Sequence, residues 1–182
     1  MACALTQGLS GITCRDNTGG IATVYLTELA NIDTITYDTD GSILTLSMDV
    51  GTQFWEYAQL KQTSEWEENF KTVAENGTFG WDQTLKIRLF KRDSNKRSEI
   101  QLLAQNTLVA IVKDMNSDGS GNPYYWLLGE VRGLDLADGS KYTSGKNVSD
   151  LNGWDLSFTG AEAQKARQVL YSLIPIIIQP AT

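Results

Sequence analysis

The feature of this sequence that most constrains its fold is a repeated alternation of apolar and polar residues, because a strand with one buried face has this period of two. Between residues 154 and 159, Trp154, Leu156 and Phe158 fall on one face and polar residues fall on the other. The same alternation recurs at Leu44, Leu46 and Met48, and at Leu85, Ile87 and Leu89. Further β-rich runs cover residues 21–29, 32–37, 53–59, 107–113 and 124–136. Together these runs predict a mainly β fold of about nine strands.

Asn76 and Gly77 predict the turn of a long β-hairpin. This dipeptide is preferred in two-residue hairpin turns, where both central residues need positive φ. The arms extend over about residues 62–90, which is longer than the usual strand of about 5–6 residues. We therefore expect this hairpin to project from the fold.

A helix over residues 64–75 is the alternative for the first arm. Ser64 and Glu67 form a capping box, and Trp66, Phe70 and Val73 recur at helical spacing. We interpret the segment as a strand, because Trp66 and Phe70 also share a strand face and the β pattern continues to Phe79 after the turn.

One short helix is predicted next to the sheets. Ser98 and Gln101 form a capping box, and Ile100, Leu103 and Ala104 make one apolar stripe. Asn106 is expected to end the helix in the left-handed conformation, after about two turns. We expect one domain over residues 1–182, with an N-terminal arm at 1–20 and a C-terminal arm at 161–182.

The C-terminal arm contains an unusually apolar run at residues 173–178. If it is extended, Ile174, Ile176 and Ile178 lie on one face, and Leu173 and Ile177 lie on the other. Such an arm exposes apolar side chains on both faces, so we expect it to dock on a neighbouring subunit.

The composition argues against an enzyme. The chain has no histidine, which removes the commonest general base and the commonest metal ligand. The acidic cluster of Glu65, Glu67, Glu68 and Glu75 lies in a polar stretch, and is interpreted as solvated residues of the hairpin. We expect no catalytic residue, no cofactor and no metal site.

Two further groups of residues that could bind a metal are not expected to do so. Residues 114–119 match the first half of an EF-hand calcium loop, but Tyr125 stands where the bidentate glutamate is needed, so a polar hairpin loop is expected. Cys3 and Cys14 are too few for a disulfide framework and cannot complete a zinc site without histidine.

The charge pattern argues against nucleic-acid binding. A net charge of −7 repels DNA. The basic run at residues 86–97 is interpreted as a solvated strand end and turn, with a subunit-contact patch as the alternative. No apolar run approaches the roughly 20 residues of a membrane span, and the N-terminus lacks the pattern of a signal peptide, so we expect a soluble protein folded where it is made.

The order of these features resembles that of a family of virion proteins, the tail or tail-tube proteins of phages that infect Bacteroidetes. The residues that carry the resemblance are Met1-Ala2-Cys3 with Gly19-Gly20-Ile21, Asn76-Gly77-Thr78 with Leu85-Lys86-Ile87, the short helix with residues 108–114, Trp126-Leu127-Leu128-Gly129, and residues 151–160. The resemblance spans most of the chain, and it is the order and spacing of its pieces that carry it.

The resemblance implies a tail-tube β-sandwich with one flanking helix, whose copies form hexameric rings. The rings would stack so that their inner sheets join into one barrel, through which genomic DNA passes without specific binding. Partners would be copies of the chain and other phage tail proteins, in a virion assembled in the host cytoplasm. The expected subunit-interface residues are Trp66, Phe70, Asn76, Gly77 and Phe79 of the hairpin, and Leu173, Ile174, Ile176, Ile177 and Ile178 of the C-terminal arm.

Two other functions stay open at this point. A tail terminator, baseplate or capsid decoration protein would share these features. A monomeric carbohydrate-binding β-sandwich would instead keep its aromatic side chains on an exposed face, whereas Trp126 and Trp154 alternate with apolar neighbours in the pattern of core residues.

Overall fold

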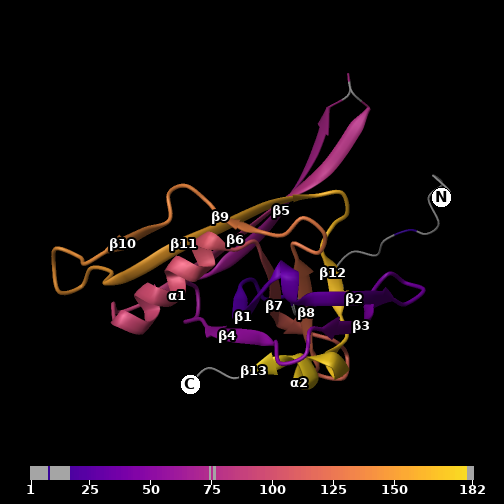
Figure 1. Cartoon of the computed structure of the whole chain (residues 1–182), viewed down its shortest axis with the longest axis horizontal. Helices are drawn as coiled ribbons and strands as arrows, with labels where there is room; N and C mark the ends of the chain where they lie inside the picture. Colours follow the sequence, from indigo (N-terminus) through magenta and orange to yellow (C-terminus); the bar gives the residue numbers. More distant parts are fainter. Residues whose placement is uncertain (1–7, 9–16, 74, 76, 180–182) are drawn as a thin grey trace.

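The computed structural model describes residues 8, 17–73, 75 and 77–179, and it contains two β-sheets, as Figure 1 shows. The larger sheet has the strand order β13 (Ile178–Gln179), β4 (Phe54–Ala58), β1 (Ile21–Glu28), β7 (Leu108–Ser117), β8 (Pro123–Leu128), β12 (Arg167–Val169), β3 (Ile43–Met48) and β2 (Ile32–Tyr37). The smaller sheet has the order β10 (Lys141–Thr143), β11 (Gly153–Glu162), β6 (Thr78–Phe90) and β5 (Glu65–Val73), and β9 (Asp135–Leu136) also pairs with β11. The predicted mainly β fold is confirmed.

The helical segments are few and short. Those described in full are α1 (Ser94–Gln105), α2 (Ile174–Ile177) and the 3-10 turns η1 (Leu29–Asn31) and η3 (Tyr171–Leu173). Within the described residues, no helix is both long and apolar enough to cross a membrane.

Strand β7 is the centre of the core, because it is buried on both faces. Leu108, Ala110 and Val112 point into an apolar layer that the two sheets and α1 share. Val109 and Ile111 point into a second layer on the other side of the larger sheet, which α2 helps to cover. Burial on both faces explains why this strand is continuously apolar and does not alternate.

The strands with one predicted apolar face are mostly confirmed. Leu85, Ile87, Leu156 and Phe158 are buried in the layer between the sheets. Leu44, however, is exposed, because the β2–β3 register shifts between Thr36 and Tyr37. This irregularity leaves Leu44 outside the pairing and turns Ile43 into the core.

The flanking helix is present but begins earlier than predicted. The side chain of Asp93 caps it by accepting a hydrogen bond from the Lys96 backbone N–H at 2.8 Å. Ser98 therefore lies inside the helix, where its hydroxyl donates to the Ser94 carbonyl. Ile100 and Leu103 are buried as predicted, whereas Ala104 is exposed.

The helix ends at Asn106, but this residue is extended, with φ −115°, and not left-handed. The Asn106 side-chain amide donates to the Leu102 carbonyl at 3.1 Å. The Asn106 side chain thus provides a hydrogen bond to a carbonyl of the last turn. In a left-handed cap, a backbone N–H would provide such a bond.

The prediction of an extended C-terminal arm is wrong. Residues 174–177 form α2, and Ile174 and Ile177 are buried in the second core layer of their own chain. Leu173 and Ile178 pack against the same layer, and Ile178 pairs in parallel with Phe54 of β4. Apart from Ile176, which is exposed, the apolar side chains of this run are therefore covered without a neighbouring subunit.

The segment before α2 is also part of the sheets. Strand β11 continues to Glu162, and β12 joins the larger sheet between β8 and β3. The described residues of this segment, 161–179, are therefore not a separate arm. Most of the predicted N-terminal arm, including Cys3 and Cys14, lies outside the described residues.

Candidate subunit interface

The long hairpin is formed by β5 and β6, whose tip extends beyond the two sheets in Figure 1. The strands pair from Glu65 opposite Lys86 to Val73 opposite Thr78, so residues 65–73 are a strand and not a helix. The register of Val73 opposite Thr78 centres the turn between positions 75 and 76, one residue earlier than predicted, so Asn76-Gly77 is not the central pair of a two-residue turn. Gly77 has φ +60°, which a glycine adopts without strain. Asn76 lies outside the described residues.

One face of this hairpin is continuous with the core. Near the sheets, Trp66 packs against the core layer, with its ring 6.3 Å from that of Trp126. Toward the tip, Phe70 and Phe79 are 56% and 63% exposed. The Phe70 ring meets the Trp81 ring edge-on at 5.3 Å. We call Phe70, Phe79 and Trp81 the tip patch; it is an apolar surface that the described residues leave largely uncovered.

The opposite face of the hairpin is charged. The Lys86 ammonium contacts a Glu65 carboxylate oxygen at 2.7 Å, and Lys71 forms an ion pair with Asp82. These cross-strand ion pairs favour the observed register of β5 and β6 on the solvent-exposed face of the hairpin. The hairpin therefore presents two chemically different faces.

Strand β5 also forms an edge of the smaller sheet. Among the described residues it pairs with β6 alone, so its outer backbone groups have no strand partner there. An edge of nine residues is long enough to pair with a strand of another chain.

The root of the hairpin is fixed by a buried amide. Gln83 donates to Glu68 at 3.0 Å and accepts a hydrogen bond from the Gly129 backbone N–H at 2.8 Å. The same Glu68 oxygen accepts the Ala166 N–H at 2.5 Å. Glu68 is therefore not a solvated acid as predicted, whereas Glu65, Glu67 and Glu75 are exposed.

The basic run at residues 86–97 is partly neutralised within the chain. Arg88 pairs with Asp155 at 2.5 Å, and Lys96 lies 3.4 Å from Asp93. Arg92 lies over the ring of Tyr142, with the guanidinium carbon 4.9 Å from the ring centroid. The run thus covers the end of β6 and a turn, as predicted, but its last residues, including Lys96 and Arg97, belong to α1.

The calcium-like sequence forms the predicted hairpin loop between β7 and β8. Asp118 accepts hydrogen bonds from the backbone N–H groups of Asn122 and Ser120, at 2.9 and 2.8 Å. These bonds lower the pKa of the Asp118 carboxyl, and the bond from Asn122 has the largest effect. In the part of the chain that the structure describes, no group of three or more metal-ligating side chains is close enough to hold an ion.

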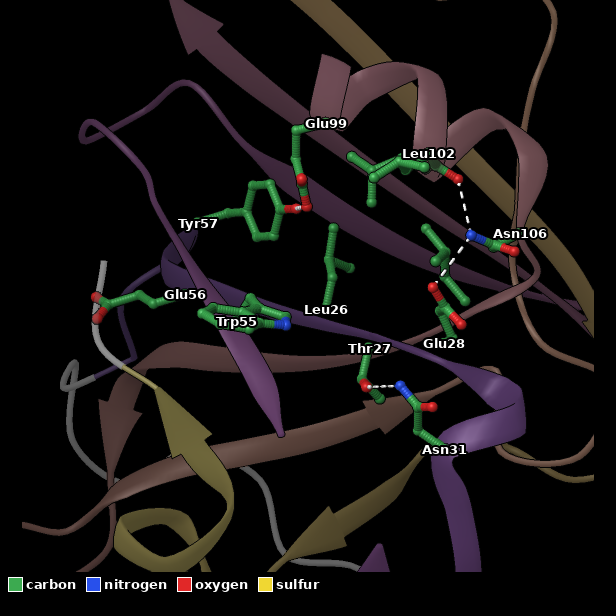
Figure 2. Close-up of a pocket in the computed structure, with 12 residues that line it drawn as sticks. Leu26, Thr27, Glu28, Asn31, Trp55, Glu56, Tyr57, Glu99, Leu102 and Asn106 are labelled. Carbon is green, nitrogen blue, oxygen red and sulfur yellow. Dashed lines mark hydrogen bonds between the residues drawn. The ribbon is translucent and has the colours of Figure 1, made fainter. Parts of the chain in front are cut away.

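A groove lies between α1 and the β1–β4 side of the larger sheet, as Figure 2 shows, with a volume of about 460 Å³. Its base is formed by buried Leu26, Leu103 and Leu108. Trp55 and Leu102 line it and are each 51% exposed.

The polar side of this groove is held by hydrogen bonds. The Tyr57 hydroxyl donates to Glu99 at 2.9 Å, and the Asn106 amide donates to Glu28 at 3.2 Å. Burial, followed by the negative charge of Glu99, raises the pKa of Tyr57. The groove was not predicted, because it depends on α1 lying beside β4. In the sequence, only the adjacent Leu102 and Leu103 indicate that α1 has apolar side chains on more than one side.

The predicted interface residues do not form one surface. The hairpin residues lie on the smaller sheet, whereas the C-terminal residues lie beside β4 of the larger one, far from the hairpin tip in Figure 1. In the C-terminal run, Ile176 is 79% exposed and remains available for contacts.

Comparison of the chain with protein-family models, with curated proteins and with solved structures finds no match.

Proposed function

We propose that this protein is a non-enzymatic structural subunit that assembles with copies of itself, and that it serves as a phage tail tube protein. In that function its rings stack into a conduit for DNA. The family resemblance of the sequence supports the phage assignment, and the tip patch supports self-assembly.

The tip patch carries the proposal because it continues the core layer beyond the body of the protein. Phe70 and Phe79 share their face with Trp66, which is packed in the core layer. Full burial of a phenylalanine contributes about 1.5–3 kcal/mol, so covering the exposed half of both rings contributes about 2 kcal/mol per copy. A neighbour that covers the patch gains this free energy, and the rigid root limits the entropy lost on contact.

The edge of β5 supports the same proposal. A neighbouring strand that pairs with this edge would extend the smaller sheet from one subunit to the next. The role requires no reactive group. The buried carboxylate of Glu162 accepts three backbone N–H groups, which is a structural use of an acid and not a catalytic one.

The experiment is electron microscopy and sedimentation velocity of the purified protein, with a tip-patch variant and a matched control. Phe70→Ser combined with Phe79→Ser should raise the concentration needed for assembly about thirtyfold, the equivalent of about 2 kcal/mol, and should leave the melting temperature of the monomer unchanged. Leu44→Ser combined with Val50→Ser removes two exposed apolar side chains elsewhere and should assemble normally.

A protein that stays monomeric at high concentration would overturn the proposal. Glycan binding by such a monomer would favour the carbohydrate-binding alternative. Closed rings that never stack would favour a tail terminator over a tube subunit.

A further inference from the structure

We propose that the groove between α1 and β4 binds the loop of residues 144–150 from a second copy of the chain. This inference rests on the proposed self-assembly and assigns a second contact to it, separate from the tip patch.

The groove combines an apolar base with an acidic rim. Two carboxylates, those of Glu28 and Glu99, face it, and its described lining includes no lysine or arginine, whereas the Glu56 carboxylate points away (Figure 2). Glu28 and Glu99 accept hydrogen bonds from Asn106 and Tyr57, which are neutral groups. Trp55 lies beside them, half exposed, and offers a ring face to a cation. The occupant that fits is an apolar side chain close to a positive charge.

The hairpin tip of a second copy does not meet this requirement. Its residues 65–82 contain five acidic side chains and one lysine, Lys71, which is already paired with Asp82. Placing this tip in the groove would bring like charges together, which is strongly unfavourable at an interface. The groove and the tip patch therefore need different partners.

The loop of residues 144–150 has the required chemistry. Val148 is 109% exposed, the largest value among the exposed apolar side chains of the described residues. Lys146, two residues earlier, is also exposed. The loop thus offers one aliphatic side chain and one positive charge close together, in the combination that the groove calls for.

The loop is also ordered before any contact. Asp150 accepts hydrogen bonds from the backbone N–H groups of Lys146 and Asn147, at 2.8 and 2.7 Å. Its own N–H donates to the Asn147 carbonyl at 3.1 Å. Because the loop already has a fixed shape, less conformational entropy is lost when it binds.

The loop and the groove are different patches of the chain. The loop follows β10 at one end of the smaller sheet (Figure 1), and the groove lies between α1 and the larger sheet (Figure 2). A contact between two different patches is heterologous, so it repeats from copy to copy and gives rings or filaments and not isolated dimers.

The test is a charge exchange across the proposed contact, read by sedimentation velocity and electron microscopy of the full chain. Lys146→Glu and Glu28→Lys should each raise the concentration needed for assembly about tenfold or more, because each places like charges together. The two substitutions combined should restore assembly. Lys165→Glu makes the same charge change at another exposed lysine and should have no effect.

Each other outcome overturns the inference in a recognisable way. If both single variants assemble normally while the tip-patch variant does not, self-assembly stands and this contact is wrong. If Glu28→Lys impairs assembly but Lys146→Glu does not, the groove binds a different occupant. If the combined variant is no better than the single ones, the two residues do not meet. A wild-type protein that is strictly monomeric overturns both this inference and the proposed function.

Discussion

Replacement of Glu162 by alanine should destabilise the protein through the loop that joins β8 to β9. Glu162 is 4% exposed, and one of its carboxylate oxygens accepts the backbone N–H groups of Val131, Arg132 and Gly133 at 3.0, 2.7 and 3.3 Å. Without the carboxylate, these donors lose their partner. The Gly133 bond is buried, so its unpaired N–H costs about 1–3 kcal/mol, while water can partly replace the other two bonds.

We therefore expect Glu162→Ala to lower the free energy of unfolding by about 2–4 kcal/mol. For a chain of this length that corresponds to a fall in melting temperature of roughly 4–16 °C. Glu162→Gln keeps an acceptor oxygen in place and should lose less. The control is Glu67→Ala, an exposed glutamate of β5, which should change stability by less than about 0.5 kcal/mol.

Urea denaturation followed by tryptophan fluorescence measures these differences. If Glu162→Ala unfolds within about 0.5 kcal/mol of the wild type, the three hydrogen bonds do not hold this loop and the reasoning is refuted.

Three further predictions concern the C-terminus and two loops. Ile177→Ala should lower the free energy of unfolding by about 2–5 kcal/mol in denaturant melts, because Ile177 is a core residue, whereas Ile176→Ala should be nearly neutral. The hydrogen bonds to Asp150, of which the one from Asn147 has the largest effect, hold the pKa of its carboxyl below the ordinary value of 3.8. The stabilising effect of these bonds is present above pH 3.8 and is lost as the pH falls through the folded-state pKa. The amide signals of the loop should report this loss by NMR. A chelator should leave the melting temperature unchanged, because the Asp118 carboxylate is already bonded within its own turn.

The sequence predicts this fold well where burial on one face decides the structure. Leu156 and Phe158 of β11 show the alternation because the opposite face of that strand is polar. The prediction fails at Leu44, where a change of register moves the neighbouring Ile43 into the core. Nothing in a pattern with a period of two marks such a bulge in advance.

The C-terminal run shows a different limit. Its β-branched residues favour a strand, but the structure places Pro175 in the first turn of α2, where its fixed φ suits a helix and its missing N–H is not needed. Ile174 and Ile177, three positions apart, then point into the same core layer. Contact with a core built from distant strands selects the helix, and local propensity does not reveal that contact.

The candidate interface also has one part that the sequence predicts, the hairpin, and one part that it does not, the groove. The hairpin was predictable because its turn and its alternating faces are local properties of residues 65–90, and the exposure of Phe70 and Phe79 follows from a hairpin longer than the sheet that covers its base. The groove beside α1 was not predictable, because Trp55 and Leu102 are distant in the sequence and are brought together only by packing.

The position of the hairpin anchor explains why assembly and stability should be separable. Gln83 ties β6 to Gly129 and, through Glu68, to Ala166, and these contacts lie between the core and the tip patch. Phe70 and Phe79 lie beyond this anchor, and the described residues leave both side chains largely exposed. Substitutions there remove exposed apolar surface and not core contacts. Substitution of Gln83 itself would leave the Gly129 N–H without its buried acceptor, so it should lower monomer stability by about 1–3 kcal/mol as well as disturb the tip. A Gln83 variant that loses assembly while keeping full stability would show that the anchor does not belong to the core.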